Sequence, residues 1–275
     1  MLNIFQEFIM NIWTELSVQF ANQRNYLDEL FKIYPISPNL RREISPTLFK
    51  RIEKAFNNRD NEELIKALLG LELFPIKDSY VSYLKRDPSA IKRNPQTINR
   101  ISGMLYDMGL DDIFDKCSAP KETNRQMGPL FKNWIDKGTL GAPVYKSVDA
   151  FVSSRGNAIL NVSDEEMKKF ANRLFGYTRE KGLDFIARFN NTYVVGEAKF
   201  LTDFGGHQNA QFDDAVSTIT SSFVSKSLQA KVIPIAILDG VLYIPSNNKL
   251  YNYLKNHPDQ IIISGLLLRE FLYSL

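Results

Sequence analysis

The chain has 275 residues, of which 44% are hydrophobic and 24% charged, so it can bury a full core in one large or two modest domains. Its net charge of +3 permits an anionic partner but is too mild to indicate one. A single cysteine, Cys117, excludes an intramolecular disulfide. With no basic segment at residues 1–7 and no apolar run of about 18 residues, we expect a cytoplasmic protein that does not enter a membrane.

Residues 1–125 show helical periodicity and no run of the alternating polar and apolar residues that is typical of strands. Two apolar stripes follow this periodicity: Phe5, Phe8, Ile9, Ile12, Trp13, Leu16 and Phe20 in the first, and Leu64, Ile65, Leu68 and Leu69 in the second. We therefore predict a mostly helical region over residues 1–125 and a separate domain over residues 126–275.

Basic side chains are concentrated between Lys85 and Arg100, where five of them are opposed by Asp87 alone, a local excess of 5 − 1 = +4. Basic and amide side chains of this kind contact the phosphates and base edges of nucleic acid. The candidates are Lys85, Arg86, Lys92, Arg93, Asn94, Gln96 and Arg100. A solvated charged surface explains the same residues, so both interpretations stay open.

A helix is predicted to start at Ser163 or Asp164, which suit a helix N-cap, and to end before Gly176. Glu165 and Glu166 would lie in its first turn, where acidic residues commonly interact with the helix dipole.

The strongest pattern is a predicted β-hairpin formed by residues 183–189 and 192–199. Both runs are rich in β-branched and aromatic residues, and only Asn190-Asn191 separates them. A two-residue turn fixes the pairing, which places Asp184 directly opposite Glu197. Alternation of side chains puts Lys199 on the same face of the hairpin.

Two carboxylates about 5 Å apart on neighbouring strands repel each other unless a positive charge lies between them. A divalent cation supplies that charge, and hard oxygen ligands with open positions suit Mg²⁺ completed by a substrate phosphate. Lys199 would then orient a metal-bound water or neutralise charge on the phosphate. The alternative is that all three side chains belong to a solvated hairpin surface.

Gly182-Leu183-Asp184 followed by Glu197-Ala198-Lys199 resembles the core of the PD-(D/E)XK nuclease superfamily, and more narrowly type II restriction endonucleases. Leu183 stands where the proline of that motif name would be. The resemblance covers roughly residues 125–275. It implies an α/β (α+β) fold with a central mixed sheet flanked by helices, and a DNA-recognition or dimerisation role for the helical region.

By this resemblance, Asp184, Glu197 and Lys199 are the catalytic residues. Asp184, Glu197 and the Ala198 carbonyl would bind Mg²⁺, with Mn²⁺ able to substitute. Related nucleases often add an acidic residue from a preceding helix, and Glu166 or Glu165 is the candidate here, with Glu180 a lesser one. The resemblance also implies a homodimer that cuts both strands of double-stranded DNA at a short site and leaves 5′-phosphate ends.

Downstream of the hairpin, we predict a helix from Asn209 to about Lys226, a buried strand over residues 231–238, and a returning strand over residues 241–244. The polar loop over residues 201–211 follows the predicted metal site. Its candidates for DNA contact are His207, Gln208, Asn209 and Gln211. No cysteine or second histidine lies near His207, which argues against a zinc site there.

Two other functions fit parts of this pattern. A repair or recombination nuclease on the same core would recognise DNA structure instead of sequence. A DNA-binding module without catalysis would use the segment from Lys85 to Arg100, but it would not need Asp184, Glu197 and Lys199 to converge on one face.

Overall fold

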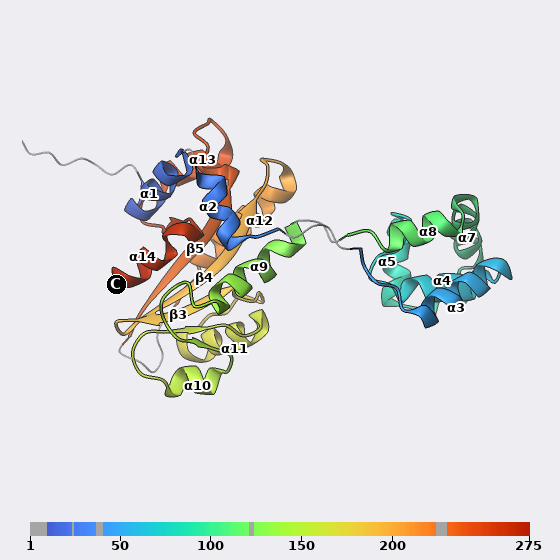
Figure 1. Cartoon of the computed structure of the whole chain (residues 1–275), viewed down its shortest axis with the longest axis horizontal. Helices are drawn as coiled ribbons and strands as arrows, with labels where there is room; N and C mark the ends of the chain where they lie inside the picture. Colours follow the sequence, from blue (N-terminus) through green and yellow to red (C-terminus); the bar gives the residue numbers. More distant parts are fainter. Residues whose placement is uncertain (1–9, 24, 37–40, 121–123, 224–229) are drawn as a thin grey trace, which may run out of the picture. The chain divides into compact units, whose positions relative to one another are not determined.

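The computed structural model describes residues 10–23, 25–36, 41–120, 124–223 and 230–275 (Figure 1). The chain forms two compact units, one made of residues 1–36 and 123–275 and the other of residues 37–122. The first unit contains the sheet, and the elements described in the second are all helices. The described residues before Ser37 thus group with the sheet and not with the helices that follow them, because Tyr26, Leu30 and Ile33 are buried in the core beside the sheet.

A six-stranded mixed sheet is the centre of the first unit, with strand order β1-β2-β3-β4-β5-β6. The strands are β1 Val144–Tyr145, β2 Ala158–Leu160, β3 Phe185–Phe189, β4 Thr192–Leu201, β5 Lys231–Gly240 and β6 Ile262–Ile263. β2, β3 and β4 pair in antiparallel fashion, whereas β1 with β2, β4 with β5 and β5 with β6 are parallel. This mixed sheet confirms the predicted fold class.

Helices cover both faces of the sheet (Figure 1). One core lies beneath α1 Ile12–Ala21, α2 Tyr26–Ile33, α9 Asn124–Asp136, α12 Gly206–Ile219, α13 Lys249–Asn256 and α14 Leu268–Tyr273. A smaller core on the opposite face lies beneath α10 Val148–Ser153 and α11 Asp164–Phe175. Two short 3-10 helices, η1 Val241–Tyr243 and η2 Gly265–Leu267, complete the unit. No helix in the described ranges is long and apolar enough to cross a membrane.

The second unit is a helical bundle with a hydrophobic core of its own. Its helices are α3 Pro46–Asn57, α4 Asn61–Leu69, α5 Ser79–Arg86, α6 Ala90–Arg93, α7 Pro95–Met108 and α8 Leu110–Cys117. Leu64, Ile65 and Leu68 of the second predicted stripe are buried in this core. Phe5, Phe8 and Ile9 of the first stripe lie outside the described residues.

The predicted hairpin is present with the expected register. Asn190 and Asn191 form the turn with φ of 43° and 63°, the left-handed conformation that asparagine tolerates. Phe189 pairs with Thr192 and Phe185 with Gly196, and the Asp184 amide donates a hydrogen bond to the Gly196 carbonyl at 3.1 Å. Continuing this register by one residue places Asp184 opposite Glu197.

The elements flanking the hairpin agree with prediction except at two points. Helix α11 starts after Ser163 and ends at Gly176, which has the left-handed conformation. Helix α12 begins at Gly206 and ends at Ile219, so the predicted continuation over residues 220–223 was wrong, and residues 224–226 lie outside the described residues. The buried strand β5 is present.

The returning strand predicted at residues 241–244 was wrong, since Val241–Tyr243 form the 3-10 helix η1. Gly240, with a φ of 102°, turns the chain so close to Leu201 that a Cβ atom would clash with the Leu201 carbonyl oxygen. Leu242 and Tyr243 are then buried, and the Tyr243 hydroxyl donates to the Leu238 carbonyl at 2.9 Å. Burial of these side chains outweighs the strand preference of the segment.

Candidate active site

Strand alternation brings the three predicted catalytic side chains to one face of the sheet. Tyr193 and Val195 belong to the core beneath α10 and α11, so Glu197 and Lys199 continue that face of β4. The Lys199 ammonium lies 2.9 Å from Asp184 Oδ2 and 2.5 Å from Glu197 Oε1. The structure therefore brings Asp184, Glu197 and Lys199 together, as the hairpin pattern predicted.

Glu197 is the most deeply buried acidic side chain of this group, with 1% of its surface exposed. Burial and the adjacent charge of Asp184 raise the pKa of its carboxyl, although Lys199 and Lys181 oppose the shift. Neither carboxylate oxygen of Glu197 receives an aligned hydrogen bond within the described residues, even though two ammonium groups lie within ion-pair distance. The two ammonium groups offset its charge in the metal-free chain, and Glu197 Oε2 has no ion-pair partner closer than theirs within the described residues.

The backbone at Ala198 also faces the site. The Ala198 amide donates to Asp184 Oδ2 at 2.9 Å, and the Ala198 carbonyl accepts a hydrogen bond from the Lys199 ammonium at 3.0 Å. Burial alone would lower the pKa of Lys199, but the charges of Asp184 and Glu197 outweigh it and hold that pKa above its usual range. Lys199 is therefore a charged hydrogen-bond donor, not a proton acceptor, near neutral pH.

These groups suit a hard divalent cation. Two carboxylates and a carbonyl oxygen are the ligands that Mg²⁺ prefers, and the Glu197 oxygens lack aligned donors. No group of three or more His, Cys, Asp or Glu side chains in the described part of the chain is placed to hold a metal ion. A cation at Asp184 and Glu197 would thus complete its coordination with the Ala198 carbonyl, water and substrate.

Two further residues reach the site that the sequence pattern did not indicate. The Lys181 ammonium lies 2.5 Å from Glu197 Oε1 and also forms an ion pair with Asp214 of α12. Arg179 pairs with the other carboxylate oxygen of Asp214, with Arg179 Nη2 3.2 Å from Asp214 Oδ1. Lys181 precedes β3 and Asp214 lies on a helix, so no strand alternation in the sequence could place either side chain.

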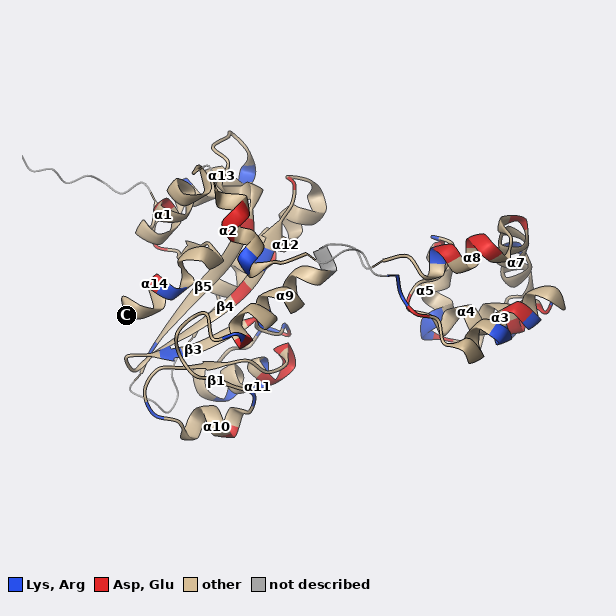
Figure 2. Ribbon diagram, viewed as in Figure 1, with Lys and Arg blue, Asp and Glu red and all other residues tan. Residues whose placement is uncertain are grey.

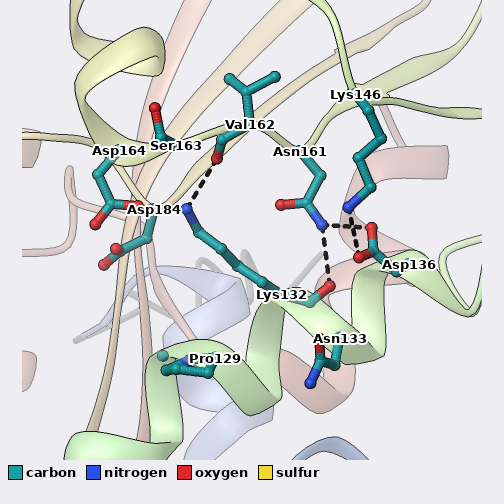
Figure 3. Close-up of a pocket in the computed structure, with 11 residues that line it drawn as sticks. Pro129, Lys132, Asn133, Asp136, Lys146, Asn161, Val162, Ser163, Asp164 and Asp184 are labelled. Atoms are coloured by element: carbon teal, nitrogen blue, oxygen red, sulfur yellow. Dashed lines mark hydrogen bonds and ion pairs between the residues drawn. The ribbon is translucent and has the colours of Figure 1, made fainter.

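A polar pocket opens beside Asp184 (Figure 3). Its lining residues are Gly128, Pro129, Lys132, Asn133, Asp136, Lys146, Asn161, Val162, Ser163, Asp164 and Asp184. Asp164, the first residue of α11, lines this pocket together with Asp184 and forms an ion pair with Lys132 of α9. The Lys132 ammonium also donates to the Val162 carbonyl at 2.9 Å. Figure 3 shows the Asp164 and Asp184 carboxylates drawn next to each other at the pocket edge.

The acidic residues expected from the α11 helix are engaged elsewhere. Glu166 completes a capping box with Ser163: it accepts from the Ser163 amide at 3.2 Å, and its own amide donates to Ser163 Oγ at 3.3 Å. Glu165 forms an ion pair with Lys168 at 2.8 Å, and Glu180 lies exposed within 3.5 Å of the same lysine. Neither Glu165 nor Glu166 lines the pocket beside Asp184, whereas the neighbouring Asp164 does.

The four predicted DNA contacts that follow β4 differ in how far they are buried. Gln208 is buried, and its amide group donates to Thr202 Oγ1 at 3.1 Å and accepts from the Thr202 amide at 3.3 Å. This role is structural and leaves no free edge for DNA. His207 is exposed, with Nε2 3.1 Å from Gln211 Nε2, and Asn209 donates to the Phe204 carbonyl at 3.1 Å.

The basic segment lies in the helical unit, on α5, α6 and the start of α7, with all seven candidate side chains exposed. Several of these side chains already have partners: Lys85 donates to the Leu71 carbonyl at 3.0 Å, and Arg93 and Arg100 pair with acidic residues at 2.6 and 2.7 Å. In Figure 2 the helical unit carries acidic segments on α3, α7 and α8 beside its basic ones. The local excess of positive charge is therefore partly neutralised.

A mixed sheet flanked by helices, with Asp, Glu and Lys side chains converging on neighbouring strands, defines a restriction-endonuclease-like protein. The chain belongs to the Tsp45I type II restriction enzyme family, whose model matches residues 11–275. This match spans both units and the candidate active site, and it confirms that the protein is a site-specific deoxyribonuclease with DNA as its substrate. No curated protein and no solved structure matches the chain.

Proposed function

We propose that the enzyme hydrolyses phosphodiester bonds of double-stranded DNA in a Mg²⁺-dependent reaction, and leaves 5′-phosphate and 3′-hydroxyl ends. The observation that carries the proposal is the Glu197 carboxylate, which is buried beside Asp184 with neither oxygen receiving an aligned hydrogen bond within the described residues. Mn²⁺ is proposed as a substitute ion, because it accepts the same oxygen ligands.

In this proposal Asp184, Glu197 and the Ala198 carbonyl hold the ion. When bound, Mg²⁺ polarises the scissile phosphate and acidifies a coordinated water. The Lys199 ammonium, anchored by Asp184 and the Ala198 carbonyl, donates hydrogen bonds to the attacking water and offsets the charge that develops on the phosphate. The raised pKa of Lys199 supports this donor role.

Asp164 is proposed as the additional acidic residue in place of Glu165 or Glu166, because it lines the same pocket as Asp184. Lys132 and Lys146 in that pocket form ion pairs with Asp164 and Asp136, so they are not proposed as DNA contacts. Further DNA contacts are proposed at the exposed Arg86, Lys92 and Gln96 of the helical unit, and at the exposed His207 and the partly buried Asn209 and Gln211 of α12.

We also propose a homodimer in the cytoplasm, where the DNA substrate is found. Each chain presents one cluster of Asp184, Glu197 and Lys199 in its described residues, and a twofold dimer would place one such cluster at each strand of a palindromic site.

The test is incubation of the purified protein with a long duplex DNA of known sequence, with Mg²⁺, with Mn²⁺ or with EDTA, alongside Glu197→Ala. We expect discrete fragments with either metal, none with EDTA, and at least a roughly 100-fold lower single-turnover rate for Glu197→Ala. Fragments that ligate directly, and fail to do so after phosphatase treatment, carry 5′-phosphates. Glu270→Gln on α14, far along the chain from the candidate site, controls for loss of an exposed carboxylate.

Cleavage that persists in EDTA would overturn the metal-dependent mechanism. Wild-type cleavage rates in Glu197→Ala would overturn the assignment of the site.

A further inference from the structure

Two ammonium groups crowd one oxygen of the buried Glu197. The Lys181 and Lys199 ammonium nitrogens each lie 2.5 Å from Glu197 Oε1, and neither is aligned for a hydrogen bond. Lys181 retains 28% side-chain exposure and Lys199 retains 23%, whereas Glu197 retains 1%. Both lysines therefore remain partly in contact with solvent while their ammonium groups contact a buried carboxylate.

The charges around Glu197 balance without any metal ion. Three cationic groups, Arg179, Lys181 and Lys199, face three carboxylates, Asp184, Glu197 and Asp214, giving 3 − 3 = 0. A divalent cation on Asp184 and Glu197 would add two positive charges beside two ammonium groups. Because the site is largely shielded from water, that repulsion is strong, and at least one ammonium group must withdraw from Glu197.

Lys199 has all of these partners inside the site. Its ammonium lies 2.9 Å from Asp184 Oδ2 and donates to the Ala198 carbonyl at 3.0 Å, so withdrawal from Glu197 would not bring it to a carboxylate outside the proposed ligands. Lys181 has its second partner outside the site, in the carboxylate of Asp214 on α12.

Asp214 is itself held in place. Arg179 Nη2 donates to Asp214 Oδ1 at 3.2 Å. Arg179 Nη1 donates to the Asp214 carbonyl at 3.2 Å and to Thr218 Oγ1 at 2.6 Å. Burial alone would raise the pKa of Asp214, but Lys181 and Arg179 outweigh it and lower that pKa, so Asp214 is ionised at neutral pH. A fixed, charged acceptor for Lys181 thus lies beside Glu197.

We propose that Lys181 is a positioning residue that occupies Glu197 in the metal-free enzyme and is transferred to Asp214 when the divalent cation binds. Lys181 then competes with the cation for Glu197, and Asp214 weakens that competition. This inference rests on the proposed metal site, and it assigns to Lys181 and Asp214 opposite effects on metal affinity.

The test is Mn²⁺ binding measured by calorimetry on the full chain without DNA. Lys181→Met should bind Mn²⁺ about tenfold more tightly than the wild type, equivalent to about 1.4 kcal/mol. Asp214→Asn should bind it more weakly by a similar factor, because Lys181 loses its alternative partner. The double variant should match Lys181→Met, since Asp214 acts through Lys181.

Lys249→Met is the matched control. Lys249 forms a 2.6 Å ion pair with Asp213, the neighbour of Asp214 on α12, and both partners are more than half exposed. Removal of that lysine should leave Mn²⁺ affinity unchanged. Thermal melting of every variant shows which of them fold, and Lys181→Gln replaces Lys181→Met if the latter does not.

Equal or weaker Mn²⁺ binding by the Lys181 variants, or unchanged binding by Asp214→Asn, would overturn the inference. Failure of the proposed function looks different. In that case the wild type would not bind Mn²⁺, or Glu197→Gln would bind it as tightly as the wild type.

Discussion

Gly182 lies so close to Asp164 that a Cβ atom on the glycine would be 2.5 Å from the Asp164 Cβ. The Leu183 amide also reaches the Asp164 carbonyl, at 3.4 Å. This contact joins the first turn of α11 to the residues that enter β3. The contact therefore brings Asp164 and Asp184, which belong to different parts of the chain, to the lining of one pocket.

Gly182→Ala should disturb this contact. The added methyl group would have to displace the first turn of α11, so we expect a loss of about 1 to 3 kcal/mol in the free energy of unfolding. The cleavage rate should fall as well, because Asp184 follows two residues later. Urea denaturation and single-turnover cleavage measure the two effects.

Gly103→Ala is the control for this substitution. Gly103 lies within α7, and apart from the adjacent residues and the backbone of the helix itself no atom is within 4 Å of the position that an added methyl group would take, so alanine there should raise stability by about 1 kcal/mol. If Gly182→Ala is as stable and as active as the wild type, the contact does not constrain the site.

Asp164→Asn tests which acidic residue of α11 serves the active site. Because Asp164 lines the pocket and Glu165 does not, we expect Asp164→Asn to reduce the single-turnover rate by about tenfold or more and Glu165→Gln to change it less than about twofold. Both variants remove one negative charge from the same helical turn, so the helix dipole affects them alike. The reverse order of effects would restore Glu165 as the candidate.

Asp239 should make stability depend on pH. Its carboxyl is fully buried at the end of β5, and burial raises its pKa from 3.8 to about 6, against hydrogen bonds from Ser264, Tyr34 and the Gly265 amide. The folded state therefore holds the Asp239 proton more tightly than the unfolded state, and this difference stabilises the fold. The contribution is complete below about pH 4 and is lost as the pH rises through about 6. About two pKa units correspond to about 3 kcal/mol.

Asp239→Asn removes this titration. The stability of the wild type relative to the variant should therefore fall by about 3 kcal/mol between about pH 4 and pH 8, measured by urea denaturation at each pH. Other groups titrate in both proteins and cancel in the difference. A constant difference for Asp239→Asn would mean that the pKa of its carboxyl is the same in the folded and the unfolded state.

Lys92→Ala tests the helical unit as a DNA-binding surface. Lys92 is exposed and, within the described residues, has no ion pair of the kind that engages Arg93 and Arg100. If Lys92 contacts a phosphate, its loss should weaken binding of all DNA sequences about equally and reduce the salt dependence, −d log K/d log [salt], by about 1. Titration of labelled duplexes at several salt concentrations in the presence of Ca²⁺ measures the binding constant and its salt dependence. Lys54→Ala on α3 is the control. An unchanged salt dependence would mean that Lys92 does not contact a DNA phosphate.

The central part of the site was predictable because its geometry is local. A two-residue turn fixed the register of β3 and β4, and alternation of side chains then placed Asp184, Glu197 and Lys199 on one face. The start and end of α11 followed from Ser163 and Gly176 for the same reason, since capping depends on neighbouring residues.

The remaining parts depend on how distant elements pack. The first turn of α11 contains three acidic residues, and the local Ser163–Glu166 capping box accounts for Glu166, but only the orientation of the helix decided that Asp164 lines the pocket. Likewise, only the placement of α12 beside β4 brought Asp214 to Lys181.

The N-terminal helices show the same limit over a longer distance. Tyr34, directly after α2, donates to Asp239 at 2.9 Å across 205 positions of sequence, which ties the first helices to the sheet unit. By itself, the sequence determined the hairpin, the convergence of Asp184, Glu197 and Lys199, and the nuclease family. Which distant side chains complete the site was decided by tertiary packing, because their positions depend on the burial of whole helix faces and not on local periodicity.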